Sequence, residues 1–237
     1  DSVQVKYQWL RAGKPISGAI ASTYIPTSLD YLKSISVTTT VTQNGFPVNT
    51  TTSPVVAIKA GTISAPDIGI AGSPVMAQTL LFTADIPYGT KGTYQWLNEG
   101  IAIPSSTRSS YVLKATDVGK NISVRVTLTK TAYNPLVLVT ESVLVGPGNQ
   151  TKQPTISITG VTRVAKSLSG VTGSWDTSVK LTYQWLRDGQ PISGAIAKTY
   201  KLTVSDVNHL ISFRVTATKA GYNTVVTTSA PTALITN

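Results

Sequence analysis

Apolar and polar residues alternate along several segments of the chain. Every second residue from Ile122 to Leu128 is apolar, and the segment that starts at Ile211 repeats the pattern. Because side chains on a β-strand point alternately to opposite faces, each segment predicts a strand with one face in a core and one face in water. No segment carries a sustained apolar stripe at the 3.6-residue period, so we expect helices to be negligible.

A block of residues occurs three times. Tyr-Gln-Trp-Leu stands at 7–10, 94–97 and 183–186, and from each motif the copies align without a gap as far as Phe46, Tyr133 and Tyr222. The period is 87 and then 89 residues, which suits one small domain per copy and is too long for one unit of a solenoid. The chain is therefore expected to be a tandem array.

Glycine and proline gather between the copies, at 61–66 and at 146–154. Such clusters mark loops and linkers. We expect three repeats, at 1–61, 62–149 and 150–237, joined by short linkers that restrict the angle between neighbours.

The first repeat is expected to be incomplete. The second and third copies have leading segments before the tryptophan strand, at 62–86 and at 154–175, with strands expected at 154–158 and 167–175, whereas only six residues precede Tyr7. Two strands of the opposite sheet would then be missing, leaving an apolar face uncovered. The sequence either starts inside a longer array, or a partner chain or neighbouring subunit donates strands to residues 1–61 by β-augmentation.

A tryptophan strand, a tyrosine strand, an aspartate at a corner and an alternating strand are typical of an immunoglobulin-like sandwich. Residues 183–222 resemble the bacterial immunoglobulin-like (Big-type) tandem repeats of secreted and cell-wall proteins of Gram-positive bacteria, especially actinobacteria. The resemblance implies an all-β fold and an extracellular, cell-surface or cell-wall location. Such repeats serve as adhesins and spacers and also accompany cell-wall hydrolases, so the resemblance leaves the function open.

Composition excludes several chemistries. The chain has no cysteine and a single histidine, His209, so disulfides, thiolate nucleophiles and histidine-rich metal sites are absent. No apolar run reaches the length of a membrane span. Hydrophobic residues make up 41% of the chain, enough for packed cores and too many for a disordered segment. We expect neither a cofactor nor a metal.

The recurrent residues favour structural roles. Asp30, Asp117 and Asp206 occupy one position in the three copies, which favours a turn-capping corner over a calcium site. Trp9, Trp96 and Trp185 are predicted as structural core, and the alternative is that their rings are platforms on which sugars stack. No pair of acids stands out for glycoside hydrolysis.

Residues that differ between copies are the candidate contacts for a ligand. Tyr31 stands where the other copies have valine, and Tyr88 lies in a loop; both could contact glycan. Residues 150–237 carry nine lysines and arginines against three acids, and the candidate contacts for a polyanion there are Lys180, Arg187, Lys198 and Lys201. They indicate either attraction to an envelope polysaccharide or teichoic acid, or a role in solubility and edge protection. No basic run suggests nucleic-acid binding.

The function expected from the sequence is that of a non-catalytic, extracellular tandem segment, a spacer or adhesive stalk of a larger surface protein or fibre. The alternative is a carbohydrate- or cell-wall-binding accessory region of a secreted hydrolase.

Overall fold

The structure, a computed structural model, describes residues 2–237, and strands dominate this part of the chain. The helical elements found there are three single 3-10 turns, η1 (Ser28–Asp30), η2 (Ala115–Asp117) and η3 (Val204–Asp206). The strands form several separate sheets in which antiparallel pairing dominates. The prediction of an all-β, immunoglobulin-like tandem fold is confirmed.

Contacts group the chain into two compact units. The first unit holds the residues up to Gly69 together with 83–95 and 124–140, and the second holds 70–82, 96–123 and 141–237. In chain order, the strands up to the middle of the sequence are β1 (Gln4–Arg11), β2 (Lys14–Pro15), β3 (Ser34–Thr42), β4 (Asn49–Thr52), β5 (Val56–Ala57), β6 (Gly61–Thr62), β7 (Ile68–Ala71), β8 (Thr79–Ala84), β9 (Lys91–Asn98), β10 (Ile101–Ala102) and β11 (Ser110–Val112). The later strands are β12 (Asn121–Thr129), β13 (Tyr133–Asn134), β14 (Leu136–Val139), β15 (Val143–Leu144), β16 (Ser157–Gly160), β17 (Ser167–Val171), β18 (Lys180–Arg187), β19 (Gln190–Pro191), β20 (Thr199–Lys201), β21 (Ile211–Thr218) and β22 (Val225–Thr228).

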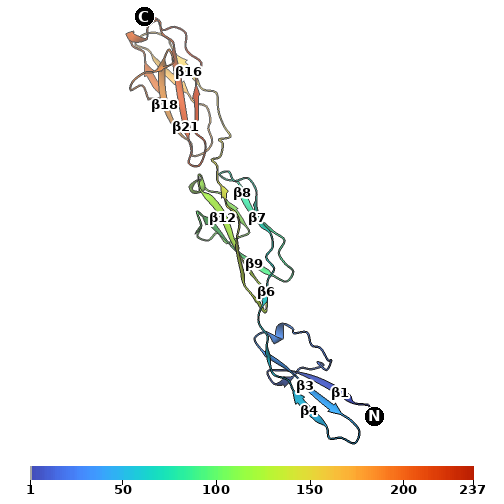
Figure 1. Cartoon of the computed structure of the whole chain (residues 1–237). Coiled ribbons are helices and arrows are strands. Elements are labelled where there is room, and N and C mark those ends of the chain that lie inside the picture. The colour runs from blue at the N-terminus through green and yellow to red at the C-terminus, as the bar shows by residue number, and fades with distance from the viewer. Residues whose placement is uncertain (1) are drawn as a thin grey trace. The chain divides into compact units, whose positions relative to one another are not determined.

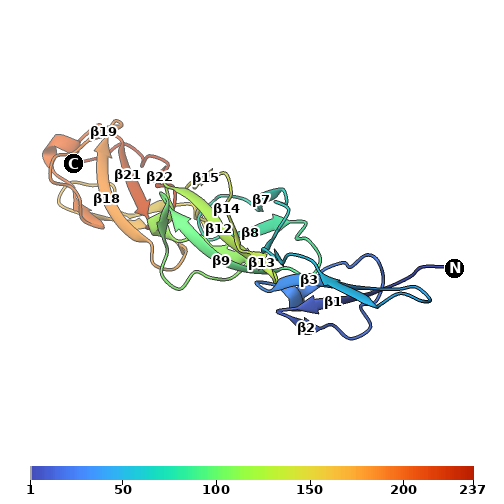
Figure 2. The same cartoon turned by 60° about the horizontal axis from the view of Figure 1, so that its bottom comes forward.

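In the first unit, residues 4–57 form one five-stranded sheet. Its order is β2-β1-β3-β4, with β5 also paired to β3 (Figures 1 and 2). Trp9 of β1 stands opposite Val37 of β3, and the outward-facing Thr38 stands opposite Thr52 of β4. Within residues 2–60 the structure contains no second sheet against the Trp9 face, as the shortened first copy predicts.

In the second unit, residues 157–228 form a two-layer sandwich. One sheet has the order β16-β17-β20 and the other has the order β19-β18-β21-β22, which is the arrangement of immunoglobulin-like domains. The core between them is built from residues of both sheets and nearby loops: Ile156, Leu168, Trp185, Leu202, Ile211, Phe213, Val215 and Ile235. The two predicted leading strands are present with other bounds: the first lies at Ser157–Gly160 instead of 154–158, and the second ends at Val171 instead of 175. Gly173 takes a left-handed conformation (φ +63°) and so prevents the second strand from continuing.

The tryptophan strand turns back through the same hairpin in each copy. Two consecutive residues after the strand have positive φ, as at Ala12 (46°) and Gly13 (78°) and at Asp188 (47°) and Gly189 (81°). This is the backbone of a type I′ turn, whose twist matches that of the flanking strands.

One glycine of each linker lies against a tyrosine of the following copy. Gly61 pairs in parallel with Tyr133, and a Cβ at Gly61 would lie 2.7 Å from the Tyr133 ring. Gly148 pairs in the same way with Tyr222, where a Cβ would lie 2.9 Å from the ring. Any larger residue would push the ring away, so glycine is required for this close approach.

Candidate functional site

The recurrent aspartates form corners that hold the fold together. Asp206 is buried and accepts hydrogen bonds from Arg187 Nη2 at 2.6 Å, from the Tyr200 hydroxyl at 3.0 Å and from the Thr203 amide at 2.7 Å. Asp30 accepts equivalent bonds in the first copy. Because every acceptor position faces an internal donor, these carboxylates serve the fold and leave nothing free for a ligand.

In the second copy the corner keeps its geometry with a neutral partner. Asn98 Nδ2 donates to Asp117 at 2.8 Å in place of the arginine, and the Tyr111 hydroxyl and the Lys114 amide donate at 2.8 Å each. Burial, and then the bond to Asp117, raises the pKa of Tyr111 well above its usual range. The corner therefore depends on directed hydrogen bonds rather than on one ion pair.

The charge state of the first corner follows from the same bonds. Burial by itself would raise the pKa of Asp30, but hydrogen bonds from Arg11, Thr27 and Tyr24 outweigh it and lower the pKa to about 2. For Asp206, bonds from Thr203 and Arg187 likewise outweigh burial and lower the pKa. Both carboxylates are ionised at neutral pH, which excludes them as general acids.

The three tryptophans are not equivalent. Trp96 and Trp185 are fully buried, whereas Trp9 is only partly buried. Each indole Nε1 donates to a backbone carbonyl at 2.9 Å, that of Ala21, Arg108 or Ala197. Each ring also stacks on the tyrosine of its own copy. The local arrangement is thus the same in all three, and what differs is the layer that covers it.

An apolar cavity of about 450 Å³ lies over the Trp9 face of the first sheet. It is lined by Trp9, Tyr24, Pro26, Ile35, Ser36, Val37, Ser53, Pro54, Val56 and Ile58. In the third copy the opposite sheet buries the equivalent face with Ile156 and Leu168. The predicted uncovered face is present, and its covering by donated strands stays a prediction.

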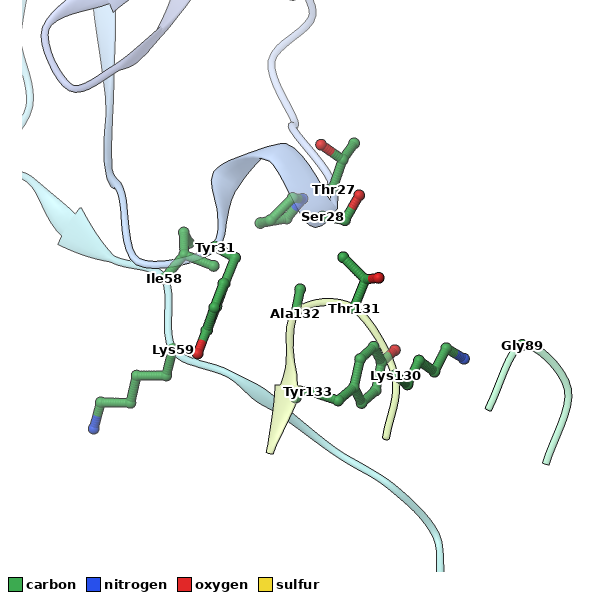
Figure 3. A pocket seen from close by; sticks show the side chains of 12 residues that line it. Thr27, Ser28, Tyr31, Ile58, Lys59, Gly89, Lys130, Thr131, Ala132 and Tyr133 are labelled. Carbon is green, nitrogen blue, oxygen red and sulfur yellow. The ribbon is translucent and has the colours of Figure 1, made fainter. Parts of the chain in front are cut away.

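A second pocket, of about 470 Å³, is lined in part by Tyr31, one of the predicted ligand contacts. Tyr31 and Ile58 stand on one side, and Ala132 and Thr131 face them across the opening (Figure 3). Thr27 and Ser28 close one end. The Lys59 ammonium points away from the opening in this view, whereas Lys130 extends along the wall toward Gly89. We call this the Tyr31 pocket; it lies wholly within the first unit.

The position of Lys130 is set by its neighbours. Its ammonium lies 4.8 Å from the centroid of the Tyr133 ring and donates to the backbone carbonyl of Tyr88 at 3.3 Å. A smaller pocket of about 300 Å³, lined by Gly89, Lys91, Thr129, Lys130 and Thr131, shares part of this wall. The Tyr88 side chain itself is 98% exposed. The loop that carries Tyr88 therefore borders the site that contains Tyr31, although sequence spacing did not suggest that the two would meet.

The four basic residues named in the third repeat do not form one patch with a single environment. Arg187 is committed to Asp206 through two hydrogen bonds of 2.8 and 2.6 Å. Lys180, Lys198 and Lys201 are exposed and lie at the start of β18, just before β20 and at the end of β20. Their contact with a polyanion stays a prediction, and the geometry gives Arg187 a structural task.

The single histidine belongs to a turn. His209 Nδ1 is paired with Asp188, and the same carboxylate accepts from the Leu210 amide at 2.9 Å. The Leu210 bond and then the His209 bond lower the pKa of Asp188.

Among residues 2–237, no three histidine or acidic side chains cluster as they would around a metal ion. In the same residues no helix is long and apolar enough to cross a bilayer.

No protein-family model matches the chain. In sequence the chain is 27% identical over 250 residues to the highly immunogenic outer capsid protein of Enterobacteria phage T4, and the match covers 98% of this chain. The chain spans 65% of the length of that relative.

Solved structures with a similar course of the chain include an adhesin described as Ca²⁺-stabilised and as helping an Antarctic bacterium to bind ice. It has a TM-score of 0.41 and 14% identity, and the match covers 99% of this chain and 65% of that one. The three N-terminal domains of the highly immunogenic outer capsid protein of bacteriophage RB49 give a TM-score of 0.28 and 15% identity over 96% of this chain and 86% of that one. Because both TM-scores are low, the assignment of the fold rests on the strand order of the sheets described above and not on these likenesses.

Proposed function

We propose that the chain is a non-catalytic, surface-displayed segment of tandem immunoglobulin-like modules that makes adhesive contacts through residues peculiar to single modules. The observation that carries the proposal is that recurrent residues and copy-specific residues have different surroundings. Side chains that recur, such as Asp30 and Asp206, are used by the fold, whereas Tyr31 and Tyr88 occur in one copy each: Tyr31 lines an open pocket, and Tyr88 is exposed beside Gly89, which lines the same pocket.

The sequence relative supports display on an outer surface. It is by name an outer capsid protein, and the similarity extends over nearly all of this chain. That relative is a phage protein and not a Gram-positive wall protein, so our proposal names an exposed surface and no particular envelope. The proposal includes the three module boundaries at 1–61, 62–149 and 150–237, which are supported by the gap-free copies in the sequence.

A bead-binding assay tests this function. Beads coated with the whole chain should bind bacterial cells or isolated envelopes saturably, and excess free chain should compete. A spacer without adhesive contacts would give no binding above that of beads coated with an unrelated immunoglobulin-like protein. Release of reducing sugar from envelope polysaccharide by the free chain would instead indicate an enzyme.

A further inference from the structure

We propose that the Tyr31 pocket binds a saccharide that carries a negative charge, such as a uronic acid. The inference rests on the proposed adhesive function and names the ligand class and the site. Four features of the pocket support it: its aromatic wall, its cations, its hydroxyl groups and its size.

The aromatic wall is specific to this copy. Tyr31 is only partly buried, and its ring borders the opening in Figure 3. The other copies have Val118 and Val207 at this position, so the fold does not require an aromatic ring there. A tyrosine offers an apolar face to the C–H groups of a sugar ring and a hydroxyl to its polar edge.

Lysines line the Tyr31 pocket and its smaller neighbour. Lys130 lines both pockets and Lys91 lines only the smaller one, and among residues 2–237 no aspartate or glutamate lines either. Lys130 uses one donor on the Tyr88 carbonyl, and an ammonium has three. A bond from an ammonium to a carboxylate is roughly twice as strong as a neutral one, so the ligand should be anionic.

Hydroxyl groups and size complete the match to a sugar. Ser28 and Thr131 bring hydroxyls to the walls, which suits a ligand with many hydroxyls of its own. The volume of about 470 Å³ falls in the range of about 300–1,000 Å³ of small-molecule pockets. The adjoining pocket of about 300 Å³ shares Gly89, Lys130 and Thr131 with it, so a second sugar unit could follow the first.

The test is a titration of the whole chain, followed by ¹H–¹⁵N NMR, with three probes: glucuronic acid, glucose and acetate. Glucuronic acid should give saturable shifts at Tyr31, Gly89 and Thr131. Glucose lacks the charge and acetate lacks the ring, so each should bind at least about tenfold more weakly. Absence of saturation with glucuronic acid, or equal binding of acetate, would overturn the proposal.

Two variants locate the site. Tyr31→Val introduces the residue that the other copies carry, so it should fold normally and weaken glucuronic acid about tenfold. Lys130→Gln should weaken glucuronic acid and leave glucose unchanged. Lys166→Gln, at an exposed lysine of the third copy that belongs to no candidate site, is the matched control and should change nothing. Unchanged affinity in Tyr31→Val would contradict the assignment.

The bead assay separates this inference from the proposed function. If beads coated with Tyr31→Val still bind cells and the wild-type chain ignores glucuronic acid, the pocket proposal fails and the adhesive function stands. If no beads bind cells but glucuronic acid saturates the pocket, the adhesive function fails and the site remains.

Discussion

The first and third repeats contain the same local arrangement under different cover. In both, the indole Nε1 donates to a carbonyl at 2.9 Å and the corner aspartate is buried. In the third repeat a second sheet leaves Phe213 and Val215 with no exposed surface, whereas their counterparts in the first repeat, Val37 and Thr39, are only partly buried. The two copies thus distinguish the stability that a module gains from short-range hydrogen bonds from the stability that it gains from a core between two sheets.

The corner and the hairpin form in the first repeat without the opposite sheet, so they do not need it. Their hydrogen bonds join residues at most about twenty positions apart along the chain. The core, in contrast, joins β17 to β21, more than forty positions apart. We therefore expect substitutions in the core to affect the two repeats unequally and substitutions in the corner to affect them equally.

The largest difference is expected for tryptophan. Trp185→Ala removes a fully buried ring and should destabilise the third repeat by about 3–5 kcal/mol. Trp9→Ala removes a ring that already faces an open cavity and should cost the first repeat less than about 2 kcal/mol. Hydrogen exchange at increasing urea, read on peptides from each repeat, measures both. Equal losses would mean that the Trp9 face is covered in solution.

The next effect should be the same in both repeats. Asparagine keeps one acceptor oxygen and places an NH2 donor where the other oxygen stood. Asp206→Asn and Asp30→Asn therefore each remove the charge that faces the arginine and set a donor against donors at one side of the corner, and each should cost about 2–3 kcal/mol. The same exchange experiment applies, with Asp67→Asn, at an exposed position, as the control. A much smaller loss at Asp30 would show that the corner depends on the second sheet after all.

The strands and the role of the corners could be predicted from sequence, because alternating apolar residues and a recurring aspartate are local signals. The uncovered face of the first repeat was also predictable, from the missing leading segment alone. The Tyr31 pocket was only half predictable. Tyr31 stood out by its difference from Val118 and Val207, but Lys130 and Thr131 reach the pocket from a hairpin about 100 positions away.

For Arg187 the sequence predicted a ligand contact where the structure shows a bond within the fold. As one of many cations in the third repeat it was a candidate for polyanion contact, yet it donates two hydrogen bonds to a buried carboxylate. The signal that could have separated it from Lys198 and Lys201 was its alignment with Arg11, because a fold contact recurs and a surface charge does not.

A third, smaller effect comes from the volume of one core position. A Cβ at Gly170 would lie 2.1 Å from the Phe213 ring, so Gly170→Ala should cost the third repeat about 1–3 kcal/mol. Phe213→Val introduces the residue found at Val37 and Val124, so the double variant Gly170→Ala/Phe213→Val should lose less stability than Gly170→Ala alone. Urea midpoints of Gly170→Ala, Phe213→Val and the double variant test this, and failure of the double variant to recover would contradict it.

In the first repeat, Val37→Phe enlarges a side chain beside a cavity of about 450 Å³ and should cost less than about 1 kcal/mol. Its urea midpoint is measured in the same way.

The smallest effect is a dependence on pH that both repeats share. The pKa of Asp30 is lowered to about 2 because the bonds from Arg11, Thr27 and Tyr24 outweigh burial, while an unfolded aspartate titrates near pH 3.9. A lowered pKa adds stability that is present above the unfolded value and is lost as pH falls through the folded one, so the loss should occur between about pH 5 and pH 2. Melting curves across this window should show both repeats weakening together. In Asp30→Asn the first repeat should lose this part of its dependence while the third keeps it. A first repeat whose acid sensitivity is untouched by the substitution would mean that another carboxylate governs it.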